Sequence, residues 1–258
     1  MTQLAHLVFR AVQELAVGSL FCLAVLPSAP IRRGFFRTCV LVLSSAVGLG
    51  VWVSPTPETV ILFVSLLLYG GSLWVRDEKW PRLVLRASLA VGAAGMLIPS
   101  VMPVDGRPLF LETTAQLINT LASTLLLGSA LIGMLLGHYY LRDPQVPVAL
   151  IRRLANLFLL ATVMQGFLLV ANVGAVYLFG GAEGAARIGL LSTSYGPALL
   201  GRLVLGTIGS FILACVIWDT LRIPNVQAAT GFFYIAILTA MIGEFLGRYL
   251  WRVTAIPL

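Results

Sequence analysis

Charged residues are scarce in this chain of 258 residues: they make up 10% of it, whereas 59% of the residues are hydrophobic. A soluble globular domain carries about 25% charged residues, so this chain has too few to cover a surface exposed to water. A soluble enzyme, a nucleic-acid-binding module and a disordered segment are therefore excluded as descriptions of the whole chain. The composition predicts an integral membrane protein.

Cysteine and histidine are also rare. The three cysteines, Cys22, Cys39 and Cys215, lie in apolar stretches without a Cys-x-x-Cys spacing, which argues against a disulfide framework, an iron–sulfur site or a zinc site. We expect them to be buried as small hydrophobic residues. A haem between two histidines is disfavoured, because His6 and His138 fall on opposite sides of the membrane in the topology below. A haem held by one histidine and one methionine has no support in the pattern.

Long apolar runs, separated by proline, glycine and charge, dominate what is present. A helix that spans a membrane needs about 20 apolar residues, and eight such helices account for most of the chain. The predicted fold is an all-α integral membrane protein, a single transmembrane domain over residues 1–258 with about eight transmembrane helices. A short surface helix is expected near residues 185–191. The eight helices are predicted at about 4–26, 36–54, 58–75, 83–103, 112–140, 148–179, 198–220 and 230–252.

The distribution of the 17 lysines and arginines predicts the orientation of these helices. Positive residues favour the cytoplasmic side of a membrane. Eleven of the 17 lie near the loops after the first, third, fifth and seventh helices, so we expect both termini to face outward. The eleven are Arg32, Arg33, Arg37, Arg76, Lys79, Arg82, Arg86, Arg142, Arg152, Arg153 and Arg222.

Two predicted helices carry charged pairs inside the membrane, where an ionisable residue is costly and is a functional candidate by default. Arg10 and Glu14 lie four residues apart on one face of the first helix, beside Gln13. Glu244 and Arg248 repeat the spacing in reverse order in the last helix. Because these helices run in opposite directions, both pairs place the glutamate about one turn deeper than the arginine.

A third polar group descends from the outer end of the fifth helix along one stripe, formed by Glu112, Gln116 and Asn119. Asn172 and Arg202, near the outer ends of their helices, can join it. Two interpretations are open. Each charged pair either neutralises itself so that its helix can enter the bundle, or contributes to a functional polar pocket. The convergence of three groups at one depth favours the pocket.

The segment from Ile242 to Leu250, with the sequence IGEFLGRYL, resembles the closing Glu-x-x-Gly-Arg segment of the haem-free membrane anchors of DMSO reductase. It is also similar to the related anchors of polysulfide and nitrite reductases, and the segment from Val12 to Gly18 is similar to their first helix. The resemblance implies two four-helix bundles and a quinol site toward the outer face of a bacterial or archaeal plasma membrane. It also implies an iron–sulfur, ferredoxin-like partner subunit and a molybdenum or other catalytic subunit. Tyr249-Leu250-Trp251 departs from the aromatic pair expected after the arginine.

On this basis we expect the chain to exchange electrons and protons between a membrane quinol, such as menaquinol, and the partner iron–sulfur subunit. Glu14 or Glu244 would accept a proton as the quinol is oxidised. The chain itself is expected to hold no haem or metal and to bind no nucleic acid. The residues predicted to bind the quinone are Arg10, Gln13, Glu112, Gln116, Arg248 and Tyr249.

Three alternative interpretations of these residues are open. His138, within Gly137-His138-Tyr139-Tyr140, and Asp219 either form a proton path at the opposite face or belong to an aromatic anchor at the membrane interface. The buried charges also suit a small ion or solute transporter. A purely structural anchor subunit is the third alternative.

Overall fold

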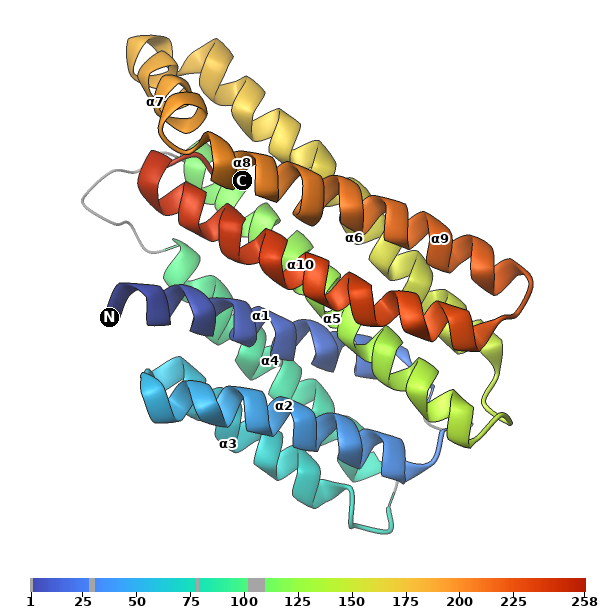
Figure 1. The fold of residues 1–258 in the computed structure, drawn as a ribbon. Coiled ribbons are helices and arrows are strands. Elements are labelled where there is room, and N and C mark those ends of the chain that lie inside the picture. The colour runs from blue at the N-terminus through green and yellow to red at the C-terminus, as the bar shows by residue number, and fades with distance from the viewer. Residues whose placement is uncertain (1, 28–30, 78, 102–109) are drawn as a thin grey trace.

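Apolar segments separated by proline-containing loops form a bundle of antiparallel rods, each of which is one long helix or a run of consecutive helical pieces (Figure 1). The computed structural model describes residues 2–27, 31–77, 79–101 and 110–258, and for 2–6, 99–101 and 110–113 it describes only the backbone. Within this part of the chain no strand occurs. Among the described residues, seven helices are long and apolar enough to cross a membrane, which confirms the prediction of an all-α membrane protein.

The first half of the chain forms four helices close to their predicted positions. They are α1 (Thr2–Val25), α2 (Arg33–Val53), α3 (Pro57–Ser72) and α4 (Lys79–Val101). With 16 residues, α3 is shorter than the other rods and is not among the seven helices long enough to span a membrane. Its start is fixed by a capping box, in which Thr56 and Thr59 each accept a hydrogen bond from the other's backbone N–H.

The second half begins with two long helices, α5 (Phe110–Arg142) and α6 (Val148–Phe179). The last helix is α10 (Val226–Thr254), which starts where the Asn225 side chain accepts a hydrogen bond from the Ala228 backbone N–H at 3.1 Å. It ends at Ala255, whose φ of 55° turns the chain out of the helix.

Between α6 and α10 the predicted seventh rod consists of three consecutive pieces. These are α8 (Gly196–Gly201), a π-helix η1 (Arg202–Gly209) and α9 (Ser210–Arg222). The predicted surface helix is present as α7 (Gly181–Thr193). The π-helix was not predicted, because its wider turn has no signal in the apolar pattern beyond the three glycines at 201, 206 and 209.

In the part of the chain that the structure describes, the rods form two groups of four. In the first group α1 and α2, α2 and α3, α3 and α4, and α4 and α1 are in contact. In the second group α5, α6, α9 and α10 contact one another in the same cyclic way. Figure 1 shows the first group below the second, with α1 lying against both α5 and α10. The junction between the groups is therefore made mainly by these three helices, and α4 and α2 add smaller contacts with α5.

Small residues allow α1 and α5 to approach closely at this junction. A Cβ atom added to Gly18 would overlap the backbone of Thr124, and one added to Gly128 would overlap the backbone of Gly18. Between apolar helices in lipid, such close backbone contact is a main source of association, because no hydrophobic effect drives the helices together. The two glycines thus fix how α1 crosses α5.

The expectation that all three cysteines are buried was correct for Cys22 and Cys39, but wrong for Cys215. Cys215 is exposed on α9, on the outer surface of the bundle. An apolar stretch in a membrane helix has a lipid-facing side as well as a packed side, so hydrophobic neighbours do not predict burial.

Candidate functional site at the junction of the helix groups

The charged residues of α1 and α10 pair across the junction rather than along their own helices. Arg248 donates a hydrogen bond to the Glu14 carboxylate and forms an ion pair with it. Glu14 is 1% exposed. Arg10, one turn earlier on α1, forms no ion pair with a residue in the described ranges. The four-residue spacing therefore placed these groups on one helical face, while the actual partner of Glu14 comes from the other end of the chain.

Glu244 is paired in a different direction, toward the seventh rod. Its Oε1 lies 3.3 Å from Nη1 of Arg202, and both side chains are almost fully buried. The same oxygen accepts a hydrogen bond from Nε2 of Gln165 at 2.7 Å. That nitrogen also lies 3.0 Å from Oγ of Ser123, and Arg202 donates to Oε1 of Gln165. One amide on α6 thus links α5, η1 and α10 through buried polar contacts.

Glycines make room for the Arg202 guanidinium between η1 and α10. A Cβ atom on Gly206 would lie 2.6 Å from Cα of Gly243, so the two backbones touch at this level. A Cβ on Gly247 would lie 3.0 Å from Nε of Arg202. The Gly-Glu-x-x-Gly-Arg pattern of α10 therefore has a packing role: its glycines admit the arginine that neutralises its glutamate.

A small cavity of about 40 Å³ adjoins these ion pairs. Glu244 and Arg248 line it from α10, and Gln116 and Asn119 line it from α5. This volume holds one or a few water molecules. Its remaining lining residues are Thr120, Ser123, Gly247, Trp251, Pro257 and Leu258.

The chain after α10 folds back to close this cavity. Pro257 and Leu258 belong to its wall, and Nδ2 of Asn172 donates a hydrogen bond of 2.8 Å to the backbone oxygen of Pro257. Asn172, which the sequence suggested as a member of the polar pocket, therefore holds the tail that covers the pocket. The left-handed turn at Ala255 provides the reversal.

Two hydrogen-bond donors at the cavity lack an acceptor among the described residues. Nδ2 of Asn119 and Nε of Arg248 are both buried and unpartnered. Unpaired buried donors are rare, because each costs about 1–3 kcal/mol. A water molecule or a ligand oxygen in the cavity would satisfy them. The site is therefore suited to a neutral or anionic oxygen acceptor, with the Glu244 carboxylate nearby.

The structure separates other predicted residues from this cavity. Tyr249 lies against Tyr195, with ring centroids 5.9 Å apart, and does not line the cavity. Gln13 is buried, also outside the cavity lining, and its Nε2 has no partner among the described residues. Glu112 stands in the first turn of α5, but its side chain lies outside the described residues, as does that of His6.

His138 and Asp219 form the predicted proton path. Both are exposed, near the C-terminal ends of α5 and α9, and neither lines the cavity at Glu244. Asp219 faces Arg222 at 3.8 Å. Tyr139, next to His138, packs its ring on Phe35 with centroids 5.4 Å apart. This tyrosine is thus part of the contact between α5 and α2.

Sequence reasoning missed Gln165 and Ser123. A signal existed for Gln165, which is the amide closest to the middle of a 32-residue apolar helix. A polar side chain at that depth needs a partner, so it predicts a buried contact although not which one. Ser123 had no such signal, because serine occurs widely in membrane helices and bonds its own backbone there.

Comparison with protein-family models, curated proteins and solved structures finds no match to this chain. The functional interpretation therefore depends on the geometry of the site and on the resemblance of the segment around Glu244. Chemically, the arrangement offers a carboxylate that can take up a proton, donors for an oxygen acceptor, and arginines that stabilise negative charge in a medium of low dielectric constant.

Proposed function

We propose that this protein is the membrane anchor subunit of a multi-subunit respiratory oxidoreductase that oxidises a membrane quinol or reduces a membrane quinone. The observation that carries the proposal is the position of Glu244. Its carboxylate lines a cavity together with the unpartnered amide donor of Asn119, while Arg202 and Gln165 hold it from behind. The resemblance of the segment 242–250 to quinol-reactive anchors adds independent support.

At this site, oxidation of one quinol to the quinone releases two protons and two electrons. Glu244 accepts one proton from the hydroxyl that faces it, and the second proton leaves to water in the cavity, because Glu14 does not line the cavity and the Arg248 guanidinium beside it has no lone pair that could relay a proton. The Asn119 amide donates to the carbonyl oxygen that forms. The electrons pass to the iron–sulfur partner subunit.

A quinone ring needs more room than the cavity provides in this structure. The volume of about 40 Å³ suits water, so the head group enters only if side chains at the wall move. Trp251 and Gln116 are the candidates, because both are partly exposed while Glu244 is fixed by its contacts with Gln165 and Arg202. The proposal therefore includes an opening of the wall on the side of these two residues.

Binding of a fluorescent quinol analogue to the purified chain in detergent tests the proposal. We expect saturable quenching of the analogue by the wild-type protein and at least tenfold weaker binding by Glu244→Gln. Glu183→Gln is the matched control, because Glu183 is an exposed glutamate on α7 and its loss leaves the cavity unchanged.

Two results would overturn the proposal. Absence of saturable quenching by a folded wild-type chain removes the quinone site and leaves a structural anchor. Flux of an ion or solute through liposomes that contain the chain alone, blocked by Glu244→Gln, assigns the charged residues to a transporter instead.

A further inference from the structure

A second and larger cavity lies in the first helix group, at the end of the bundle that is opposite the Glu244 cavity. Its volume is about 630 Å³, within the range of about 300–1,000 Å³ for ligand sites. The ends of α1 and α3 and the starts of α2, α4 and α6 surround it. It shares no lining residue with the small cavity at Glu244. The proposed quinone chemistry does not use it.

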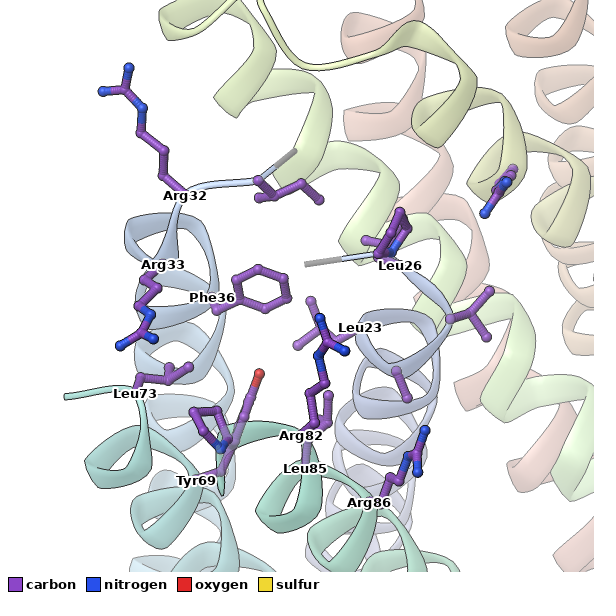
Figure 2. Close-up of a pocket in the computed structure, with 16 residues that line it drawn as sticks. Leu23, Leu26, Arg32, Arg33, Phe36, Tyr69, Leu73, Arg82, Leu85 and Arg86 are labelled. Carbon is purple, nitrogen blue, oxygen red and sulfur yellow. The ribbon is translucent and has the colours of Figure 1, made fainter. Parts of the chain in front are cut away.

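The floor of this cavity is apolar and buried. Leu23 and Leu26 come from α1, Phe36 from α2 and Leu85 from α4, and each is at most 6% exposed. Tyr69 adds a polar group within this floor. Figure 2 shows its hydroxyl and the guanidinium of Arg82 pointing into the space beside the Phe36 ring.

The rim of the cavity is basic. Of the residues that the structure describes, five arginines line it and no aspartate or glutamate does. Arg32 extends away from the cavity (Figure 2), and it pairs with Asp143 at 3.1 Å. Arg33 donates to the backbone oxygens of Val75 and Arg76, which ties the start of α2 to the segment after α3. The other three are Arg82, Arg86 and Arg153.

Arg86 and Arg153 have no ion pair or hydrogen bond with any residue in the described ranges, although they line the same cavity from α4 and α6. The tendency of arginines to lie on the cytoplasmic side accounts for their presence at this end of the bundle, but not for their gathering around a hollow. Both α2 and α4 also begin here, so the positive ends of two helix dipoles point toward it. The local field therefore favours an anion.

We propose that this cavity binds a phosphate group carried on an amphiphilic molecule, namely the head group of an anionic phospholipid of the surrounding membrane. One guanidinium group can donate two parallel hydrogen bonds to two oxygens of a phosphate. Basic pockets between membrane helices are suited to anionic head groups. The apolar floor distinguishes this site from a site for inorganic phosphate, because it gives the glycerol and the first part of an acyl chain a surface to contact.

The test uses the full chain in detergent, with phosphatidylglycerol, phosphatidylcholine or inorganic phosphate added at one salt concentration. Lipid adducts are counted by native mass spectrometry, and their affinity is measured by titration. We expect phosphatidylglycerol to bind in preference to phosphatidylcholine. The double variant Arg86→Gln with Arg153→Gln should bind it about 25-fold more weakly, since each basic residue near an anionic lipid contributes a factor of about five.

The matched control is the double variant Arg76→Gln with Arg142→Gln. It removes the same charge from the same end of the bundle, and neither residue lines the cavity. The proposal requires the control to keep at least a third of the wild-type affinity. An equal loss in both double variants would mean attraction to the surface as a whole and would overturn the site. Binding of inorganic phosphate that excludes phosphatidylglycerol would overturn the lipid as the source of the phosphate.

Discussion

Glu14 on α1 forms its ion pair with Arg248 on α10, 234 positions away in the sequence, although Arg10 stands one turn from it on its own helix. This pair joins the first helix of one four-helix group to the last helix of the other. It lies beside a cavity that the Glu244 carboxylate also lines. A contact that holds the two groups together is thus also part of the candidate site.

Breaking this pair should destabilise the protein. Arg248→Gln leaves the Glu14 carboxylate buried without a counter-charge, which in proteins costs about 3–5 kcal/mol. Unfolding in mixed micelles by titration with SDS measures the loss. Combining it with Glu14→Gln should recover part of the stability, because the unpaired charge is then gone.

The pair of Arg187 with the exposed Glu183 on α7 serves as the control for that experiment. Arg187→Gln should cost no more than about 1 kcal/mol, as for other surface pairs. If Arg248→Gln cost as little as this control, the Glu14 carboxylate would not depend on Arg248.

Closing the space between η1 and α10 should separate the two backbones and disturb Arg202. Gly243→Ala adds a methyl group where the Gly206 and Gly243 backbones touch, and overpacking of this kind costs about 1–3 kcal/mol. Gly231→Ala, on the same helix, meets no atom within 4 Å and should stabilise the helix by about 0.5–1 kcal/mol. The thermal unfolding temperature should fall in Gly243→Ala and rise in Gly231→Ala, relative to the wild type. Equal shifts in the two variants would contradict the close crossing of η1 and α10.

Removing the amide of Gln165 should weaken the core of the second group. Gln165→Leu takes a hydrogen bond from Glu244 and another from Arg202, and a buried group left without its partner costs about 1–3 kcal/mol. Gln227→Leu changes an exposed glutamine of α10 and should be close to neutral. Denaturant titration of both variants distinguishes the two cases. A neutral Gln165→Leu would show that water replaces the amide.

Two substitutions distinguish the cavity in the structure from the site predicted from the sequence. Asn119→Leu removes the unpartnered donor and should weaken binding of a quinol analogue about fivefold, the value of one hydrogen bond. Tyr249→Phe should leave binding unchanged, since Tyr249 packs on Tyr195 outside the cavity lining. Fluorescence quenching measures both. A loss in Tyr249→Phe alone would favour the site predicted from the sequence over the cavity in the structure.

The positions of the rods were predictable because proline and glycine separate the apolar runs so regularly. The predicted break at Pro55-Thr56-Pro57 lies where α2 ends and α3 begins, and the break at Asp143–Pro147 separates α5 from α6. In contrast, Cys215 and the η1 segment were not predicted. Burial and helix width depend on which neighbour packs against a face, and a single apolar pattern does not encode the neighbour.

The candidate site was predictable as a set of residues but not as a set of contacts. Glu14, Glu244 and Arg248 stood out because charge inside a membrane is costly. Their partners were assigned by the four-residue spacing, whereas the structure pairs them with residues 234 and 42 positions away. Spacing along one helix gives the face on which a side chain stands, and the partner is then decided by helix packing.

The π-helix has a consequence for how the seventh rod tolerates change. A turn with an extra residue fixes the rotation of the segment that bears Arg202 relative to α9. Because the wider turns of η1 absorb the extra residue, deleting one residue between Arg202 and Gly209 would restore ordinary α-helical winding and keep the upstream segment in phase with α9. The Arg202 guanidinium would then keep its direction toward the carboxylate of Glu244. Deleting one residue from α9 instead, which has no wider turn to absorb the change, would rotate the segment that bears Arg202 by about 100° about the axis of the rod.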